Sequence, residues 1–315
     1  MKTRHKCGLG KRTTFFTVIG VALRSIAYLS IILSSVATIA IPLLYKGGSR
    51  WAPVYVSMLI LTWSLLFWGI RLSAIGRRYL SRVLDAPDEL YDQSFVLYLR
   101  SFGNDSVLAK PEMTFIDAVT PLNGHILFSS GLTAEEQIVQ ALASAGPVVA
   151  AGRPGEKLPH VGALRIYLTE ESWQEVVLDL MRRARLVVLS VGLGRGLLWE
   201  LHQAVHSLPP NRLVILVSQS REEYEEFQKS LEAYFDSMTS NRNPMARVSG
   251  SNVINLPDFP TAEEWENLGV FHSWLISFNS DWVAERTTLA GSGLQRNRIR
   301  KALREAVNPL LQRLS

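Results

Sequence analysis

Two long apolar runs dominate the first quarter of the hydropathy pattern. Residues 25–45 and residues 51–70 contain no charged side chain, and about 20 apolar residues are enough to cross the hydrocarbon core of a bilayer. Only residues 46–50 separate the two runs, so we predict a transmembrane helical hairpin over residues 13–70. A cleaved signal peptide, with Ser35-Val36-Ala37 as the cut, is the alternative for the first run, but the second run would still anchor the chain.

The basic residues around these runs predict their orientation. They flank the pair on its outer sides far more than in the hairpin turn, which holds only Lys46 and Arg50; the outer ones are Lys2, Arg4, Lys6, Lys11, Arg12, Arg71, Arg77, Arg78 and Arg82. Cytoplasmic segments carry an excess of Lys and Arg. We therefore expect a multi-pass protein of the plasma (inner) membrane, with both termini and the basic residues 1–12 in the cytoplasm.

The pattern changes after a connector, residues 71–93, whose first half continues as a helix and whose Pro87 ends it. Short apolar runs then alternate with helical segments, at residues 95–99, 147–151, 164–168, 186–189, 213–217 and 253–256. Several of these runs lack the alternation of a half-exposed strand, which is typical of parallel strands covered on both faces. The expected fold class is α/β, a flavodoxin-like doubly wound parallel sheet over residues 94–258.

Helix starts support this order of elements. A hydroxyl residue followed three positions later by Glu, the capping-box pattern, occurs at Thr133, Ser172, Ser220 and Thr261. The helix that begins near Thr133 is expected to end at Gly146. Residues 259–315 are predicted to form two C-terminal helices, an amphipathic one over 261–282 that packs on the domain or on a partner, and a basic one over 295–313 that is solvated or rests on anionic lipid.

Ligand chemistry is expected in the loops at the carboxyl ends of the strands. The first such loop holds Arg100, Ser101 and Phe102, suited to a phosphate or a ribose, and the second holds Arg153 between glycines and prolines. A surface turn and a solvated connector are the plain alternatives for these two loops.

A third loop, Ser190 to Gly196, precedes a helix that carries Trp199 and Glu200. Gly192 and Gly194 would let a ligand approach the backbone, although the spacing is GxGxG and not the GxGxxG of dinucleotide-binding folds. The Glu200 carboxylate could bind a ribose hydroxyl or stabilise an oxocarbenium-like centre as an N-glycosidic bond breaks. A helix-start Glu that interacts only with the helix dipole is the alternative.

The motif RSFGND after the first strand, and the run from Trp173 to Ala204 with its Trp and Glu-Leu pair, resemble Toll/interleukin receptor (TIR) domains. The likeness covers residues 94–235, with GRPGEKLP in place of that family's long loop after the second strand and an added segment at residues 103–132. In enzymatic members the Glu of the Glu-Leu pair is the catalytic residue of an NAD glycohydrolase, so the resemblance implies that role for Glu200. It also implies a part in bacterial antiviral defence, where some members carry transmembrane anchors.

Composition narrows the remaining classes. A single Cys, Cys7, excludes an intrachain disulfide framework, and the six His show no metal-ligand spacing. The net charge of +5 comes from cations at both chain ends beside apolar runs, which favours anionic lipid over nucleic acid as a partner. No cofactor is expected, and NAD is the candidate substrate.

Two functions follow from the sequence. The first is a membrane-anchored NAD glycohydrolase with Glu200 as the catalytic residue and with Arg100, Ser101, Phe102, Arg153, Gly192, Gly194 and Trp199 around the ligand. The second is a non-catalytic signalling or nucleotide-sensing module that self-associates through its α/β domain. The first requires that Glu200 and Arg100 face the same hollow.

Overall fold

The computed structural model describes residues 10–44, 51–81, 83–84, 86–90, 93–101, 134–152, 161–169, 171–240, 254–267, 273–289 and 298–312. The chain divides into two compact units. The first contains two long helices, and the second, which begins at residue 82, contains a β-sheet with its covering helices. Cys7, Phe102, Arg153, the hairpin turn 46–50 and the segment 103–132 lie outside the described residues.

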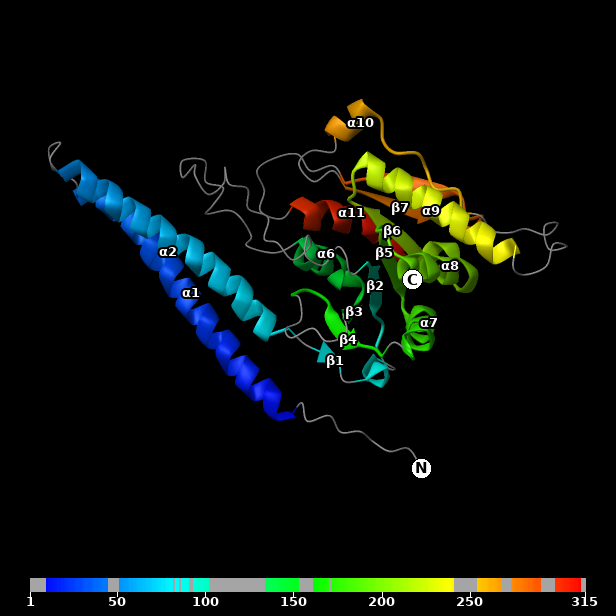
Figure 1. Ribbon diagram of the computed structural model, residues 1–315, viewed down its shortest axis with the longest axis horizontal. Coiled ribbons are helices and arrows are strands. Elements are labelled where there is room, and N and C mark those ends of the chain that lie inside the picture. Colours follow the sequence, from blue (N-terminus) through cyan, green and yellow to red (C-terminus); the bar gives the residue numbers. More distant parts are fainter. Residues whose placement is uncertain are drawn as a thin grey trace. The chain divides into compact units, whose positions relative to one another are not determined.

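The first unit is a pair of helices, α1 (Gly10–Leu44) and α2 (Ala52–Tyr79), drawn in blue in Figure 1. Both are long and apolar enough to cross a membrane. Their contact is a seam of small residues seven positions apart: Gly20 meets Gly76, Ala27 meets Gly69, and the Ser34 hydroxyl donates to the Thr62 carbonyl at 2.8 Å. Such residues let two helix backbones approach closely. The two helices therefore pack against each other through small residues, and large apolar side chains such as Leu29 and Ile39 are exposed.

The second unit is built on one sheet of eight strands in the order β1-β4-β3-β2-β5-β6-β7-β8. The strands are β1 (Val83–Leu84), β2 (Val96–Arg100), β3 (Val148–Gly152), β4 (Leu164–Tyr167), β5 (Leu186–Ser190), β6 (Leu213–Val217), β7 (Trp274–Phe278) and β8 (Ala284–Thr288). Pairs from β1 to β6 are parallel, and the β6–β7 and β7–β8 pairs are antiparallel. The α/β class is confirmed, with a mixed sheet.

The strand order differs from the flavodoxin-like order expected from the sequence. In that order the third strand lies between the first and the fourth. Here β2 lies directly between β3 and β5, and β4 lies outside β3. Only residues 153–163 separate β3 from β4 in the chain, and strands joined by short connections usually lie next to each other in the sheet. The five central strands thus follow the 3-2-1-4-5 order of dinucleotide-binding folds.

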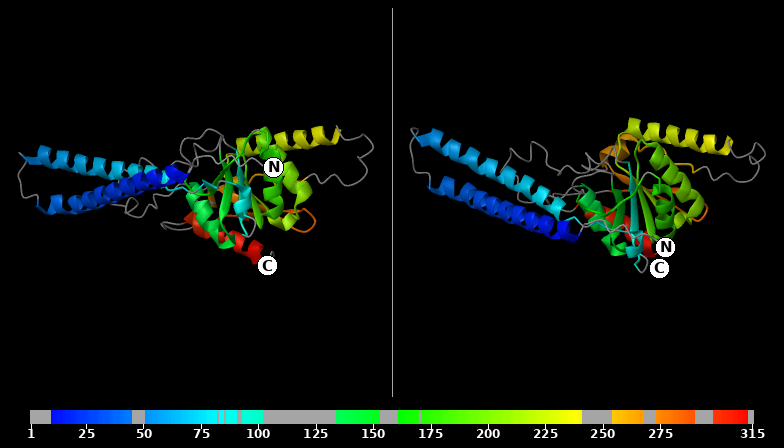
Figure 2. Two further views of the ribbon diagram at one scale, coloured as in Figure 1. Left: turned by 90° about the horizontal axis from the view of Figure 1, so that it is seen from below. Right: turned by 60° about the horizontal axis from the view of Figure 1, so that its bottom comes forward.

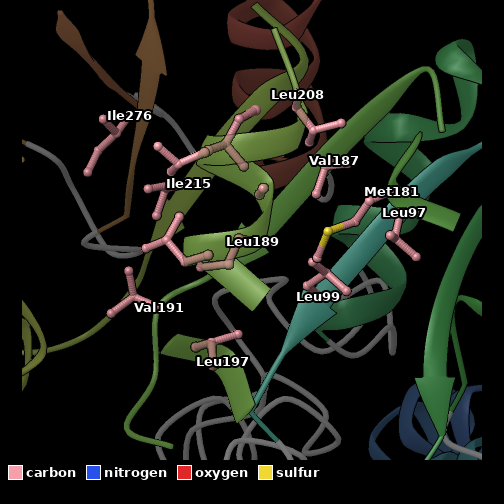
Figure 3. Close-up of a cluster of buried hydrophobic side chains, with 14 of the residues drawn as sticks. Leu97, Leu99, Met181, Val187, Leu189, Val191, Leu197, Leu208, Ile215 and Ile276 are labelled. Atoms are coloured by element: carbon pink, nitrogen blue, oxygen red, sulfur yellow. The ribbon is translucent and has the colours of Figure 1, made fainter. Parts of the chain in front are cut away.

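Helices cover both faces of this sheet (Figure 2). On one face lie α6 (Ala134–Leu142) and α11 (Arg298–Gln312), and on the other lie α7 (Trp173–Arg183), α8 (Arg195–Ser207) and α9 (Arg221–Ser240). Along β2 the side chains alternate, so Val96 and Tyr98 join the core beneath α6, whereas Leu97 and Leu99 join the core beneath α7 and α8. Figure 3 shows Leu97 and Leu99 in this second core, with Met181 of α7 and Leu197 of α8.

The C-terminal part departs from the two predicted helices. Among the described residues between 261 and 282, only α10 (Ala262–Asn267) is helical, and Trp274–Phe278 is strand β7, fully buried between β6 and β8. The apolar residues of this range, whose spacing of three and four predicted one amphipathic helix, therefore belong to two different elements. The stretch from Ile254 to Pro260 is irregular and not a strand. The connector 71–93 likewise contains β1, which pairs with β4.

The last helix packs onto the sheet instead of standing apart. In α11 the side chains of Leu303, Val307 and Leu311 are buried in the core that α6 also covers, and Pro309 lies inside the helix without ending it. The basic residues Lys301 and Arg304 are exposed on its outer side. The described elements of residues 259–315, which are α10, β7, β8 and α11, lie in the same compact unit as the rest of the sheet.

The predicted helix caps are confirmed at two of four places. The hydroxyls of Ser220 and Thr261 accept from the backbone N–H of Glu223 and Glu264, and the two carboxylates accept in return. Ser172 makes no side-chain cap bond, because its hydroxyl pairs with that of Thr169 at 2.9 Å. Thr133 lies outside the described residues. Gly146, with φ 130°, ends the α6 segment as expected.

Candidate functional site at the carboxyl edge of the sheet

The strand order fixes where a ligand would bind. In an open α/β sheet the ligand lies outside the carboxyl ends of the strands, at the point where the strand order reverses. That point falls between β2 and β5. The loops that follow these strands meet there, since the Ser101 hydroxyl donates to the Leu193 carbonyl across 3.4 Å. The structure thus brings together Ser101, Gly192 and Gly194, three residues that the sequence proposed for ligand binding.

The glycine turn leads directly into helix α8. Gly194 is its N-cap in an extended conformation, and no side chain caps the helix start. The first backbone N–H groups of a helix have no partner within the helix and carry a partial positive charge. Of the residues that the structure describes, a Cβ at Gly194 would meet only the Ser101 hydroxyl oxygen, at the ordinary distance of 3.5 Å. The helix start can therefore receive an anion, and glycine is not sterically required at position 194.

A cleft of about 460 Å³ lies beside the glycine turn. The turn, Arg195 and Leu198 form one wall, and helix α9 forms the other with Phe227, Ser230 and Tyr234. This volume is within the range of small-molecule sites, which are largely apolar with a few polar groups. The α9 wall was not predicted from the sequence, although the spacing of Phe227, Leu231 and Tyr234 marks one face of a helix.

Glu200 lies one turn further along α8 and is 9% exposed. Burial raises the pKa of its carboxyl to about 8, so the neutral acid is the main form at neutral pH. Within the described part of the chain no group hydrogen-bonds to this carboxyl. The neighbouring Trp199 packs edge-on against Trp173 of α7, with ring centres 4.8 Å apart. Neither Glu200 nor Trp199 lines the cleft.

Arg100 lies on the opposite face of the sheet from α8. It follows Tyr98 in the alternation of β2, and its guanidinium Nη2 is 3.5 Å from the Glu135 carboxylate of α6. Side chains two residues apart on a strand share a face, so Arg100 lies on the face of Tyr98 and not on the face that α8 covers. The expectation that Arg100 and Glu200 share one hollow is therefore wrong. Arg165 of β4 binds the same carboxylate at 2.6 Å.

The side chain of Tyr98 lies near the charged residues Arg100, Arg165 and Glu135. Its pKa is raised to about 12, first by complete burial and then by the nearby charge of Glu135, while Arg100 acts in the opposite direction. The phenol is therefore neutral at every physiological pH.

Two residues that the sequence predicted for the site cannot be placed. Phe102 and Arg153 lie outside the described residues, so their places in the site stay predictions. Among the residues that the structure describes there is no group of three or more His, Cys, Asp or Glu that could hold a metal ion.

Comparisons with protein-family models, with curated proteins and with solved structures find no match. The likeness to TIR domains therefore stays a prediction from the motifs.

Proposed function

We propose that this chain is a membrane-anchored sensor whose α/β domain binds a phosphate-bearing nucleotide at the glycine turn after β5. The observation that supports this most is the position of that turn, at the reversal of strand order and at the uncapped start of α8, beside a cleft of ligand size. In dinucleotide-binding folds a phosphate group lies at such a helix start.

The cleft suggests how the rest of the ligand binds. Arg195 provides a positive charge at the start of α8, and Phe227 and Tyr234 provide apolar and aromatic surface for a planar base. Ser230 adds a hydroxyl between them. The phosphate would thus bind at the glycine turn and the base against α9.

We further propose that α1 and α2 cross the plasma (inner) membrane with both termini in the cytoplasm, so that the α/β domain meets cytoplasmic nucleotides. The seam of small residues between the helices and the exposed apolar side chains around it support insertion as a pair. The cations that flank the hairpin in the sequence support the orientation. Anionic lipid and a second copy of the chain are the partners proposed with this arrangement.

Equilibrium binding of labelled ATP and NAD to the full chain in detergent tests the nucleotide proposal. Arg195→Ala should weaken binding at least tenfold, because it removes the cation at the helix start. Arg182→Ala, an exposed arginine in the last turn of α7, is the matched control and should bind as the unmodified chain does. If the unmodified chain binds neither nucleotide, or if both variants bind alike, the proposal is wrong.

Cleavage of NAD is the second candidate function, and the observation in its favour is the protonation state of Glu200. An acidic group held neutral at neutral pH without a described partner is typical of functional sites. Its burial away from the cleft makes binding without cleavage the first choice. Nicotinamide release by the full chain clustered on liposomes, absent in Glu200→Gln, would support the TIR-like enzyme in defence; equal release by both would remove Glu200 from that role.

A further inference from the structure

The carboxylate of Glu135 is bound as a ligand would be. It lies in the first turn of α6 and is 1% exposed. Arg165 Nη2 donates to both of its oxygens, at 2.6 and 2.9 Å. The backbone N–H of Ala163 approaches one oxygen at 3.4 Å, and Arg100 Nη2 lies 3.5 Å from the other. Donors from two strands far apart in the sequence, β2 and β4, therefore converge on one anion.

The backbone is shaped around this carboxylate. Gly162 has φ 137°, a conformation that favours glycine. A Cβ at this position would lie 3.0–3.3 Å from the Cγ, Oε1 and Cδ atoms of Glu135. Any larger residue would therefore press on the bound carboxylate from the side that Gly162 leaves open.

Arg165 offers more N–H donors than the Glu135 carboxylate accepts. Arg165 is completely buried, and within the described chain its Nε and Nη1 have no hydrogen-bond acceptor, because only Nη2 contacts Glu135. An arginine holds a carboxylate or phosphate most strongly through two nitrogens side by side. A buried donor without an acceptor costs free energy. The guanidinium is thus arranged for an oxyanion with more acceptor oxygens than Glu135 offers.

We infer that Arg165, Arg100 and the Gly162–Ala163 backbone form an oxyanion site for phosphate, which Glu135 occupies as an internal substitute in this structure. Phosphate and the start of α6 then compete for the same donors. Binding of the ligand releases the first turn of α6, and withdrawal of the ligand lets Glu135 return. None of these residues lines the cleft beside α9, so the inference does not depend on the nucleotide proposal.

The competition can be tested with inorganic phosphate on the full chain in detergent. In Glu135→Gln the internal anion is gone, and phosphate should raise the Tm saturably relative to chloride at equal ionic strength. The unmodified chain and the exposed-site control Glu232→Gln should respond several-fold more weakly at the same phosphate concentration. The double variant Glu135→Gln with Arg165→Met should lose the response.

A second measurement needs no variant. Hydrogen exchange in α6 of the unmodified chain, at the amides that bond to the carbonyls of its first turn, should accelerate several-fold at high phosphate, while exchange in α9 stays constant. AMP in place of inorganic phosphate distinguishes a nucleotide phosphate from free phosphate as the source. The inference is overturned if Glu135→Gln shows no saturable response, or, should that variant not fold, if exchange in α6 is unchanged by both anions.

Discussion

The hydroxyl of Ser101 and the carbonyl of Leu193 are 3.4 Å apart, although 92 positions separate the two residues in the chain. This hydrogen bond joins the end of β2 to the glycine turn after β5 at the reversal of strand order. It gives the turn a fixed position next to the start of α8. A ligand at that helix start would therefore meet a preorganised backbone.

Removing this link should affect ligand binding more than stability. Ser101→Ala deletes the hydrogen bond to the Leu193 carbonyl, a loss of about 0.5–1.5 kcal/mol, and should weaken nucleotide binding several-fold by loosening the turn. Ser207→Ala, which removes a hydroxyl bonded within α8 far from the turn, is the control. Calorimetric titration and thermal unfolding of both variants provide the comparison. Equal affinities would show that the link does not position the turn.

The buried acid Glu200 predicts a pH dependence of stability. Its folded pKa of about 8 exceeds the ordinary value of 4.5, so the folded chain binds more protons than the unfolded chain between these values. Stability is therefore favoured at low pH and lost as pH rises toward 8, by up to about 1.4 kcal/mol per pH unit from this one group. Urea unfolding of the full chain from pH 5 to pH 9 measures the slope.

Glu200→Gln should remove this contribution and stabilise the chain above neutral pH, because the amide has no charge to desolvate. The exposed Glu232→Gln on α9 should leave the slope as it is. A slope that survives in Glu200→Gln would contradict the assignment to this carboxyl.

The seam between α1 and α2 predicts strong size dependence at Ala27. This residue is completely buried against Gly69, so Ala27→Leu should force the helices apart at a cost of about 1–3 kcal/mol. Ala22→Leu makes the same change at an exposed position of the same helix and should be nearly neutral. Thermal unfolding in detergent micelles separates the two, and equal Tm values would argue against the seam.

Two serines at helix starts should differ although the sequence pattern around them is the same. Ser220→Ala loses a bond from the Glu223 N–H and should cost about 1 kcal/mol of unfolding free energy. Ser172→Ala loses no cap bond and should cost a few tenths of that or less. Urea titration of the two variants gives the values, and an equal loss would refute the distinction.

Much of the framework was predictable from local pattern. The apolar length of residues 15–41 and 52–79, the central strands and the glycine stop at Gly146 follow from composition and backbone chemistry within a few residues of each position. The helix-like spacing over residues 261–282 misled, because the burial of Trp274 to Phe278 comes from β6 and β8 and not from the segment itself.

Pairing between distant segments decided the rest. The sequence placed Arg100, Ser101, Gly192, Gly194 and Glu200 in loops or helix starts, and it determined that they carry suitable chemistry. Only the tertiary structure decided that Ser101 joins the glycine turn, that Arg100 turns to Glu135 beneath α6, and that α9 completes the cleft. The physical reason is that strand order and the alternation of side chains between sheet faces depend on contacts across the whole sheet, which no local stretch of residues encodes.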